Sequence, residues 1–202
     1  MPALPAVPAA KVVLLAGPSG CGKSRLAERS GLSVLALDDF YRSGDDPDLP
    51  RLPHGEVDWD HPGSWNAAAA QAALESLCRT GSAEVPVYDL AANGPSGSRT
   101  VSLRDERVFV AEGIFVAELV AGCADHDLLE RAICVRRSRW ITFALRLSRD
   151  LRERRKSPAF LVRRGLLLAR REPAIVRALL AAGCRPMSVR ATRRYLAGLK
   201  QR

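Results

Sequence analysis

The chain has 202 residues, of which 47% are hydrophobic and 26% charged, and its formal net charge is +9. This length is enough for one domain with a substantial core, and the ordinary charge content excludes wholesale disorder. No apolar run approaches the roughly 20 residues that span a bilayer, so the sequence predicts no membrane partner.

Residues 1–10 contain three prolines and no basic residue, which predicts a disordered leader rather than a signal peptide. We expect residues 11–202 to form a single domain. The five cysteines are odd in number and include no C-x-x-C pair. This pattern favours reduced thiols in a cytoplasmic protein over a disulfide framework or a zinc site.

A phosphate-binding motif, G-x-x-x-x-G-K-[ST], follows directly behind the apolar run 12–16. It reads Gly17-Pro18-Ser19-Gly20-Cys21-Gly22-Lys23-Ser24. The backbone N–H groups of such a loop wrap a phosphate, and a helix that begins at about Lys23 adds its positive end. Lys23 can reach the outer phosphates, and the Ser24 hydroxyl can hold Mg²⁺. The sequence therefore predicts ATP and Mg²⁺ as cofactors, against the alternative of a glycine-rich turn with an incidental lysine.

Apolar segments alternate with helical patterns, which predicts an α/β fold with a parallel sheet flanked by helices, as in P-loop nucleoside triphosphate hydrolases. The expected strands are 11–16, 34–37, 107–111 and 132–135. The expected helices are 23–30, 64–79, 114–122, 137–155 and a C-terminal group over 159–199 interrupted by Pro173 and Gly183. Residues 85–88 and 99–103 flank a stretch rich in Gly, Pro, Ser and Asn, which predicts a β-hairpin flap with a long loop.

Acidic residues follow two of these strands. Asp38 and Asp39 come directly after 34–37, and Glu112 follows 107–111. Open α/β sheets bind ligands at the carboxyl ends of their strands, beside the phosphate loop. One of the two aspartates can accept a proton from a substrate hydroxyl, and Glu112 can join Ser24 at the metal. The alternatives are a helix-capping or turn-forming aspartate and an exposed strand-end glutamate.

The positive charge is concentrated in one segment. Residues 136–171 contain twelve arginines and one lysine against two acids, so the rest of the chain is slightly acidic. We expect Arg146, Arg149, Arg154 and Lys156 to lie on an arginine-rich helical lid that closes over a triphosphate. A solvated basic face and a nucleic-acid surface are the alternatives, and the scarcity of interleaved aromatic residues argues against nucleic acid.

The ordered set of motifs resembles the uridine kinase (uridine–cytidine kinase) family of P-loop kinases, which is related to phosphoribulokinase. The likeness covers roughly residues 11–158. Besides the phosphate loop, it rests on Leu37-Asp38-Asp39-Phe40-Tyr41, Asp58-Trp59-Asp60-His61-Pro62, Val85-Pro86-Val87-Tyr88-Asp89, Ala111-Glu112-Gly113-Ile114 and Arg149-Asp150-Leu151-Arg152-Glu153-Arg154.

The resemblance implies an ATP-dependent kinase that phosphorylates the 5′-hydroxyl of uridine or cytidine. It makes Asp38 the general base close to the metal and Glu112 a metal-associated acid. Asp60, assisted by Arg146, would grip the ribose, and Tyr88 would line the nucleobase pocket. The lid residues implied are Arg149, Arg154 and Lys156.

Two departures keep other functions open. The family has a base-contacting histidine after the tyrosine, and here Asn93 stands at about that position in what we expect to be an enlarged loop. Beyond residue 158 the pattern is lost, and only the stretch 184–189 is a candidate for the family's final strand. A kinase for another hydroxylated metabolite and a nucleotide-dependent nucleic-acid-binding regulator remain alternatives, and a homo-oligomer stays open.

Overall fold

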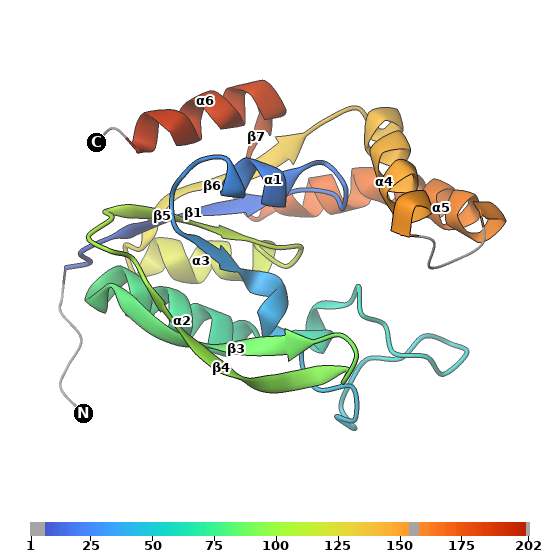
Figure 1. Ribbon diagram of the computed structural model, residues 1–202, viewed down its shortest axis with the longest axis horizontal. Coiled ribbons are helices and arrows are strands. Elements are labelled where there is room, and N and C mark those ends of the chain that lie inside the picture. The colour runs from blue at the N-terminus through green and yellow to red at the C-terminus, as the bar shows by residue number, and fades with distance from the viewer. Residues whose placement is uncertain (1–6, 154–157, 201–202) are drawn as a thin grey trace.

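The computed structural model describes residues 7–153 and 158–200. Its centre is a five-stranded parallel sheet with the order β2-β5-β1-β6-β7, and the strand that leads into the phosphate loop lies in the middle (Figure 1). The strands are β1 (Lys11–Ala16), β2 (Val34–Ala36), β5 (Val108–Glu112), β6 (Leu129–Arg136) and β7 (Arg185–Ser188).

Helices cover both faces of the sheet, as the α/β prediction required. On one face lie α2 (Ala67–Thr80) and α3 (Ala117–Asp125), and on the other lie α1 (Lys23–Glu28) and α6 (Val189–Leu199) (Figure 1). Alternate residues of β1 supply the two cores because side chains of a strand point to opposite faces.

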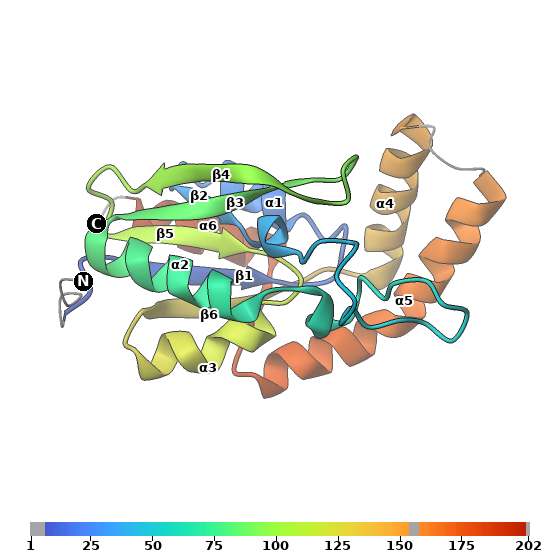
Figure 2. The same ribbon diagram turned by 90° about the horizontal axis from the view of Figure 1, so that it is seen from below.

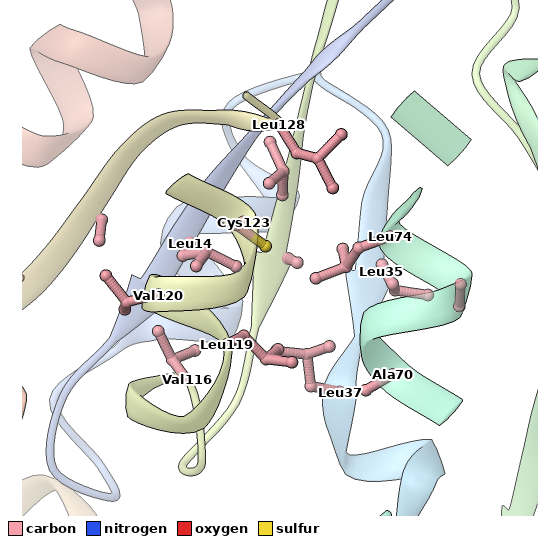
Figure 3. Close-up of a cluster of buried hydrophobic side chains, with 14 of the residues drawn as sticks. Leu14, Leu35, Leu37, Ala70, Leu74, Val116, Leu119, Val120, Cys123 and Leu128 are labelled. Atoms are coloured by element: carbon pink, nitrogen blue, oxygen red, sulfur yellow. The ribbon is translucent and has the colours of Figure 1, made fainter. Parts of the chain in front are cut away.

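Val12 and Leu14 pack toward α2 and α3, whereas Val13 and Leu15 pack toward α1 and α6. Figure 3 shows Leu14 in the first cluster, among Leu74 of α2 and Leu119 of α3.

An antiparallel hairpin of β3 (Ser82–Asp89) and β4 (Gly94–Ser102) packs against α2. The hairpin was expected, but its long loop was wrong: the Gly- and Ser-rich stretch after Asn93 is strand, and the connection is only 90–93. These residues have weak intrinsic strand preference, and pairing with β3, which shifts register between Val87 and Tyr88, overrides it.

The arginine-rich segment forms α4 (Arg139–Glu153), which packs against α5 (Pro158–Ala181). Helix α4 and the first part of α5 make an arm that projects from one end of the molecule (Figure 2). The expected interruption at Pro173 is wrong, because α5 runs through it. A proline removes one backbone N–H donor from a helix, and here the burial of Val176 and Leu179 in the first core cluster favours continuing the helix beyond it.

The other boundaries differ from prediction by a few residues. The expected strand 34–37 ends one residue early, and Leu37–Phe40 forms a short 3-10 helix, η1. The candidate final strand is confirmed as β7, an edge strand that tolerates Pro186. Of the leader, residues 1–6 lie outside the described residues, and Ala10 is buried with its N–H donating to the Cys78 carbonyl at 2.9 Å.

None of the helices in the described ranges combines the length and apolar character that crossing a membrane requires.

Candidate active site

The phosphate loop joins β1 to α1 and turns through three glycines with positive φ. These angles are 145° at Gly17, 83° at Gly20 and 98° at Gly22. A Cβ on Gly17 would also lie 2.9 Å from the Val135 carbonyl oxygen of β6. Only glycine tolerates both the positive φ and this close approach, so the turn itself requires glycine at position 17 of the motif.

Lys23 is buried, and its Nζ donates to the Gly17 carbonyl oxygen at 3.0 Å. The lysine thus closes its own loop and lies where phosphate oxygens can replace that carbonyl. Cys21 is buried inside the loop, and burial raises the pKa of its thiol. A protonated, enclosed thiol agrees with a structural rather than a chemical role for Cys21.

Three strands end at the same level beside this loop. In the parallel register, Glu112 of β5 is opposite Leu15 of β1 on one side and Ala36 of β2 on the other. The chain continues from Leu15 into the phosphate loop and from Ala36 into η1, which carries Asp38. The sheet therefore brings together the loop, Asp38 and Glu112, as the strand-end argument predicted.

The Asp38 side chain is open to solvent. Protein atoms crowd it nonetheless, and this partial desolvation raises the pKa of Asp38. The negative charge of Glu112 raises it further, Lys23 lowers it, and Asp39 adds a smaller rise. The pKa is thus moved toward neutrality, which suits a general base.

The two adjacent aspartates have different surroundings. Asp39 Oδ2 is 3.1 Å from Arg99 Nη2 of β4, an ion pair that ties η1 to the hairpin. Asp38 instead lies beside Gly113, where a Cβ would come 3.6 Å from its Oδ1. This arrangement favours Asp38 as the acid that faces the loop.

Aromatic rings gather next to Asp38. The Tyr41 ring centroid is 5.7 Å from Trp59, 5.8 Å from Tyr88 and 5.8 Å from Phe115. The Tyr41 hydroxyl donates to the Trp59 carbonyl at 3.2 Å. Desolvation, with Asp38 and other nearby groups adding to it, raises the pKa of Tyr41 well above its ordinary value. Of these rings, sequence reasoning singled out only Tyr88.

Trp65 is a residue that sequence reasoning missed. Its ring is buried, 5.6 Å from Phe115, and its Nε1 donates to the Leu37 carbonyl at 2.7 Å. This bond fixes the residue that precedes Asp38. The available signal was a tryptophan at the second residue of the helix predicted over 64–79, but its hydrogen-bond partner is 28 residues away.

Asn93 lies at the hairpin tip with φ 53°. Its carbonyl accepts from the Gly44 N–H at 2.7 Å, and its Oδ1 accepts from the Tyr88 hydroxyl at 3.3 Å. A Cβ on Gly44 would collide with the Asn93 side chain. Asn93 therefore anchors the hairpin tip to the loop after Arg42.

Asp60 is exposed in the loop between η1 and α2. Its Oδ2 is 4.0 Å from Arg171 Nη1 of α5, with side-chain exposures of 65% and 53%. Such an open pair contributes little to stability. It does place the arm next to the loop that carries Asp60, a neighbour that sequence reasoning did not identify.

The lid residues are only partly located. Arg146 and Arg149 belong to α4, and the structure describes their backbone alone. Arg154 and Lys156 lie outside the described residues.

The oxygen atoms at this edge of the sheet are suitable ligands for a magnesium ion. Ser24 offers an exposed hydroxyl, and Asp38 and Glu112 offer carboxylates that interact electrostatically. Within the described ranges, no group of three or more His, Cys, Asp or Glu side chains could hold a metal alone. Mg²⁺ usually takes one or two carboxylates, with water and substrate phosphates completing its coordination, so the set fits.

Two cavities differ in their relation to this site. One of about 540 Å³ lies between the hairpin and the segment after η1, and Tyr41, Asn66 and Pro86 help line it. The other, of about 660 Å³, is lined by Lys11 and Arg107 at the opposite edge of the sheet, where the strands begin. Only the first adjoins the aromatic rings.

Curated relatives similar to this chain include several uridine kinases. No protein-family model matches the chain. A uridine kinase of Deinococcus deserti is 28% identical over 165 residues, covering 77% of this chain and 75% of the relative. A uridine kinase of Lactobacillus helveticus is 25% identical, covering 72% and 70%, and one of Staphylococcus aureus is 28% identical, covering 74% and 72%.

Among solved structures, a putative fructose transport system kinase from Silicibacter sp. TM1040 matches with a TM-score of 0.61. It is 20% identical and covers 89% of this chain and 88% of the other. The shared feature at this identity is the fold of the P-loop kinases.

Proposed function

We propose that this chain, an alcohol phosphotransferase related to the uridine kinases, transfers the γ-phosphate of ATP to the 5′-hydroxyl of uridine or cytidine. The observation that carries the proposal is the meeting of Asp38, Lys23 and Glu112 at one edge of the sheet. A phosphate loop with an adjacent proton acceptor is what transfer to an alcohol requires.

On the donor side, the N–H groups of the phosphate loop and Lys23 bind the triphosphate. The hydrogen bond from Lys23 to the Gly17 carbonyl already shapes the loop before ATP binds. On binding, a phosphate oxygen takes the place of that carbonyl. Ser24, Asp38 and Glu112 would hold Mg²⁺, which when bound adds positive charge to the phosphates.

At the reacting centre, Asp38 accepts the proton of the acceptor hydroxyl while the oxygen of that hydroxyl bonds to the γ-phosphorus. The bond from that phosphorus to the bridging oxygen breaks, ADP leaves, and Asp38 later returns the proton to water. Arg149 and Arg154 of the lid would neutralise charge on the transferring group. Because the pKa of Asp38 is raised, its carboxylate is a stronger base than an ordinary aspartate.

On the acceptor side, Tyr88 with Tyr41 and Trp59 offers ring faces for a pyrimidine. Base stacking on aromatic side chains contributes about 1–3 kcal/mol per base. Asp60, with Arg146, would bind the ribose hydroxyls, and Asn93 and Lys156 complete the acceptor residues that we propose.

A second candidate is a kinase for another hydroxylated metabolite. It is favoured by Asn93, whose carboxamide oxygen already accepts from Tyr88 and whose backbone is bonded to Gly44. An amide held in this way is less free to read a pyrimidine edge than the histidine of the family. The Silicibacter protein that matches 89% of the chain is a putative fructose transport system kinase, so sugars belong among the acceptors tested.

The experiment is an ADP-release assay with ATP and a panel of acceptors: uridine, cytidine, adenosine, fructose and ribose. We expect uridine or cytidine to stimulate ADP release and to yield the 5′-monophosphate, identified by mass spectrometry. Stimulation by a sugar but by neither pyrimidine nucleoside would replace the first candidate with the second. The Lys23→Met variant, which loses the triphosphate contact, is the control for contaminating kinases.

Nucleic acid is a poor alternative partner. Trp140 is exposed on the arm, and the Arg139 guanidinium already lies 5.3 Å from the centre of its ring. We also place the protein in the cytoplasm, because all five cysteines are buried free thiols.

A further inference from the structure

Arg137 lies beside the phosphate loop, although no motif singled it out. It occupies the short connection between the end of β6 at Arg136 and the start of α4 at Arg139. A Cβ on Gly22 would lie 4.0 Å from its Nη2. The guanidinium therefore lies next to Gly22, the N-cap residue of α1.

The position of Arg137 is fixed by the sheet rather than by the arm. β6 pairs with β1 as far as Ala16, opposite Cys134, and the phosphate loop begins at the next residue. The Val135 carbonyl oxygen would lie 2.9 Å from a Cβ on Gly17, and Arg137 follows Val135 by two residues. Arg137 thus lies directly after the end of β6, two residues before α4 begins.

The charge of Arg137 is not neutralised by a neighbour within the described ranges. Its side chain is half-buried, and no hydrogen bond or ion pair to it occurs there. Its field reaches the loop interior: burial raises the pKa of Cys21, Lys23 lowers it most, and Arg137 lowers it as well. Lys23, in contrast, already donates to Gly17. Arg137 is thus an available cation at a loop built for anions.

We propose that Arg137 binds a phosphate of the donor nucleotide directly, as a residue of the triphosphate site separate from the lid. The inference rests on the donor half of the proposed function and is independent of the acceptor. A guanidinium offers several N–H donors in a planar fork that matches phosphate oxygens, whereas the lysine of the loop acts as a point charge.

The test measures binding of ATP, ADP and inorganic tripolyphosphate by calorimetry, without acceptor. The variants are Arg137→Ala, Arg137→Lys and the matched control Arg136→Ala, which removes an exposed neighbouring arginine. We expect Arg137→Ala to weaken ATP and tripolyphosphate alike by roughly 10- to 100-fold, the loss of a charge-assisted hydrogen bond. Arg137→Lys should recover part of the affinity, and Arg136→Ala should bind like the wild type.

Three results would overturn the assignment. Unchanged ATP affinity in Arg137→Ala would remove the contact. Weaker ATP binding with unchanged tripolyphosphate binding would move the contact to the nucleoside. A lowered Tm of the ligand-free variant with unaltered tripolyphosphate affinity would make Arg137 a structural partner of the buried Glu172, whose charge also reaches Cys21.

The two proposals fail separately. Loss of affinity in Arg137→Ala together with no turnover of any nucleoside by the wild type would sustain the donor contact and refute the acceptor. Nucleoside turnover with full ATP affinity in the variant would do the reverse.

Discussion

Replacing Asp38 with asparagine removes the proton acceptor while keeping the size and shape of the side chain. General-base catalysis contributes typically 10²- to 10⁴-fold to a rate, which corresponds to about 2.7–5.5 kcal/mol of barrier. Asp38 is solvent-accessible and lies outside both core clusters, so the variant should fold normally. We expect kcat of Asp38→Asn to fall by this range, with ATP affinity measured separately and nearly unchanged.

The pH dependence follows from the causes of the raised Asp38 pKa. The base must be deprotonated, so kcat/KM should fall as the pH drops through that pKa, at a higher pH than for an ordinary aspartate. Asp39→Asn removes a negative charge that raises the Asp38 pKa, and the acid limb should therefore move to lower pH. Of the two acids that raise it, Asp39 is the cleaner probe, because Glu112 is also a proposed metal residue.

Stability should move in the opposite direction from activity. A carboxyl whose folded pKa is raised contributes stability below its ordinary pKa and loses it as the pH rises through the raised value. At pH 7–8 the charged Asp38 is therefore unfavourable for folding, although its exposure makes this effect small. Asp38→Asn should match or slightly exceed the wild-type Tm at this pH, and the difference should vanish in acid.

Either of two outcomes would contradict the role of Asp38 as proton acceptor. A kcat within a few-fold of the wild type in Asp38→Asn would remove Asp38 from proton transfer. A large fall in Tm would show that lost activity reflects lost structure. Thermal unfolding at two pH values, alongside the rate measurements, separates these cases.

Three further substitutions probe the supports of the site. Gly113→Ala would put a Cβ 2.8 Å from Leu37 Cβ, and overpacking of this kind costs about 1–3 kcal/mol, so Tm and kcat should both fall. The control is Gly198→Ala, in open space on α6, which should lower neither Tm nor kcat. Trp65→Phe would leave the Leu37 carbonyl without its donor, and unfolding by urea should show a loss of about 1–3 kcal/mol. Tyr88→Ala should raise the nucleoside KM by roughly 5- to 100-fold and leave the KM for ATP unchanged; equal effects on both would remove Tyr88 from the acceptor pocket.

The donor side was predictable from sequence because its determinants are local. The turn through Gly17 and Gly22 and the burial of Lys23 arise within eight consecutive residues. The approach of Asp38 to Glu112 was also predictable, because parallel strands end at a common edge. Both inferences depend on chain order and spacing alone.

The acceptor side depends on contacts between distant segments. The hairpin continues through Gly94 because β3 supplies hydrogen-bonding partners, which composition does not reveal. Asn93 meets Gly44 from 49 residues away along the numbering, and Arg171 meets Asp60 across more than half the chain. Such pairs follow from how elements pack, so the substrate's identity is harder to derive than the reaction class.

The two halves of the site rest on different sides of the sheet. The phosphate loop is anchored by Leu15 and Cys21 in the cluster under α1 and α6, whereas η1 is anchored by Leu37 in the cluster that contains Trp65 and Phe115. Because β1 and β5 carry residues of both clusters, the sheet sets the distance between donor and acceptor. A cavity made on the α2 side should therefore disturb acceptor binding before ATP binding, and one on the α6 side should do the opposite.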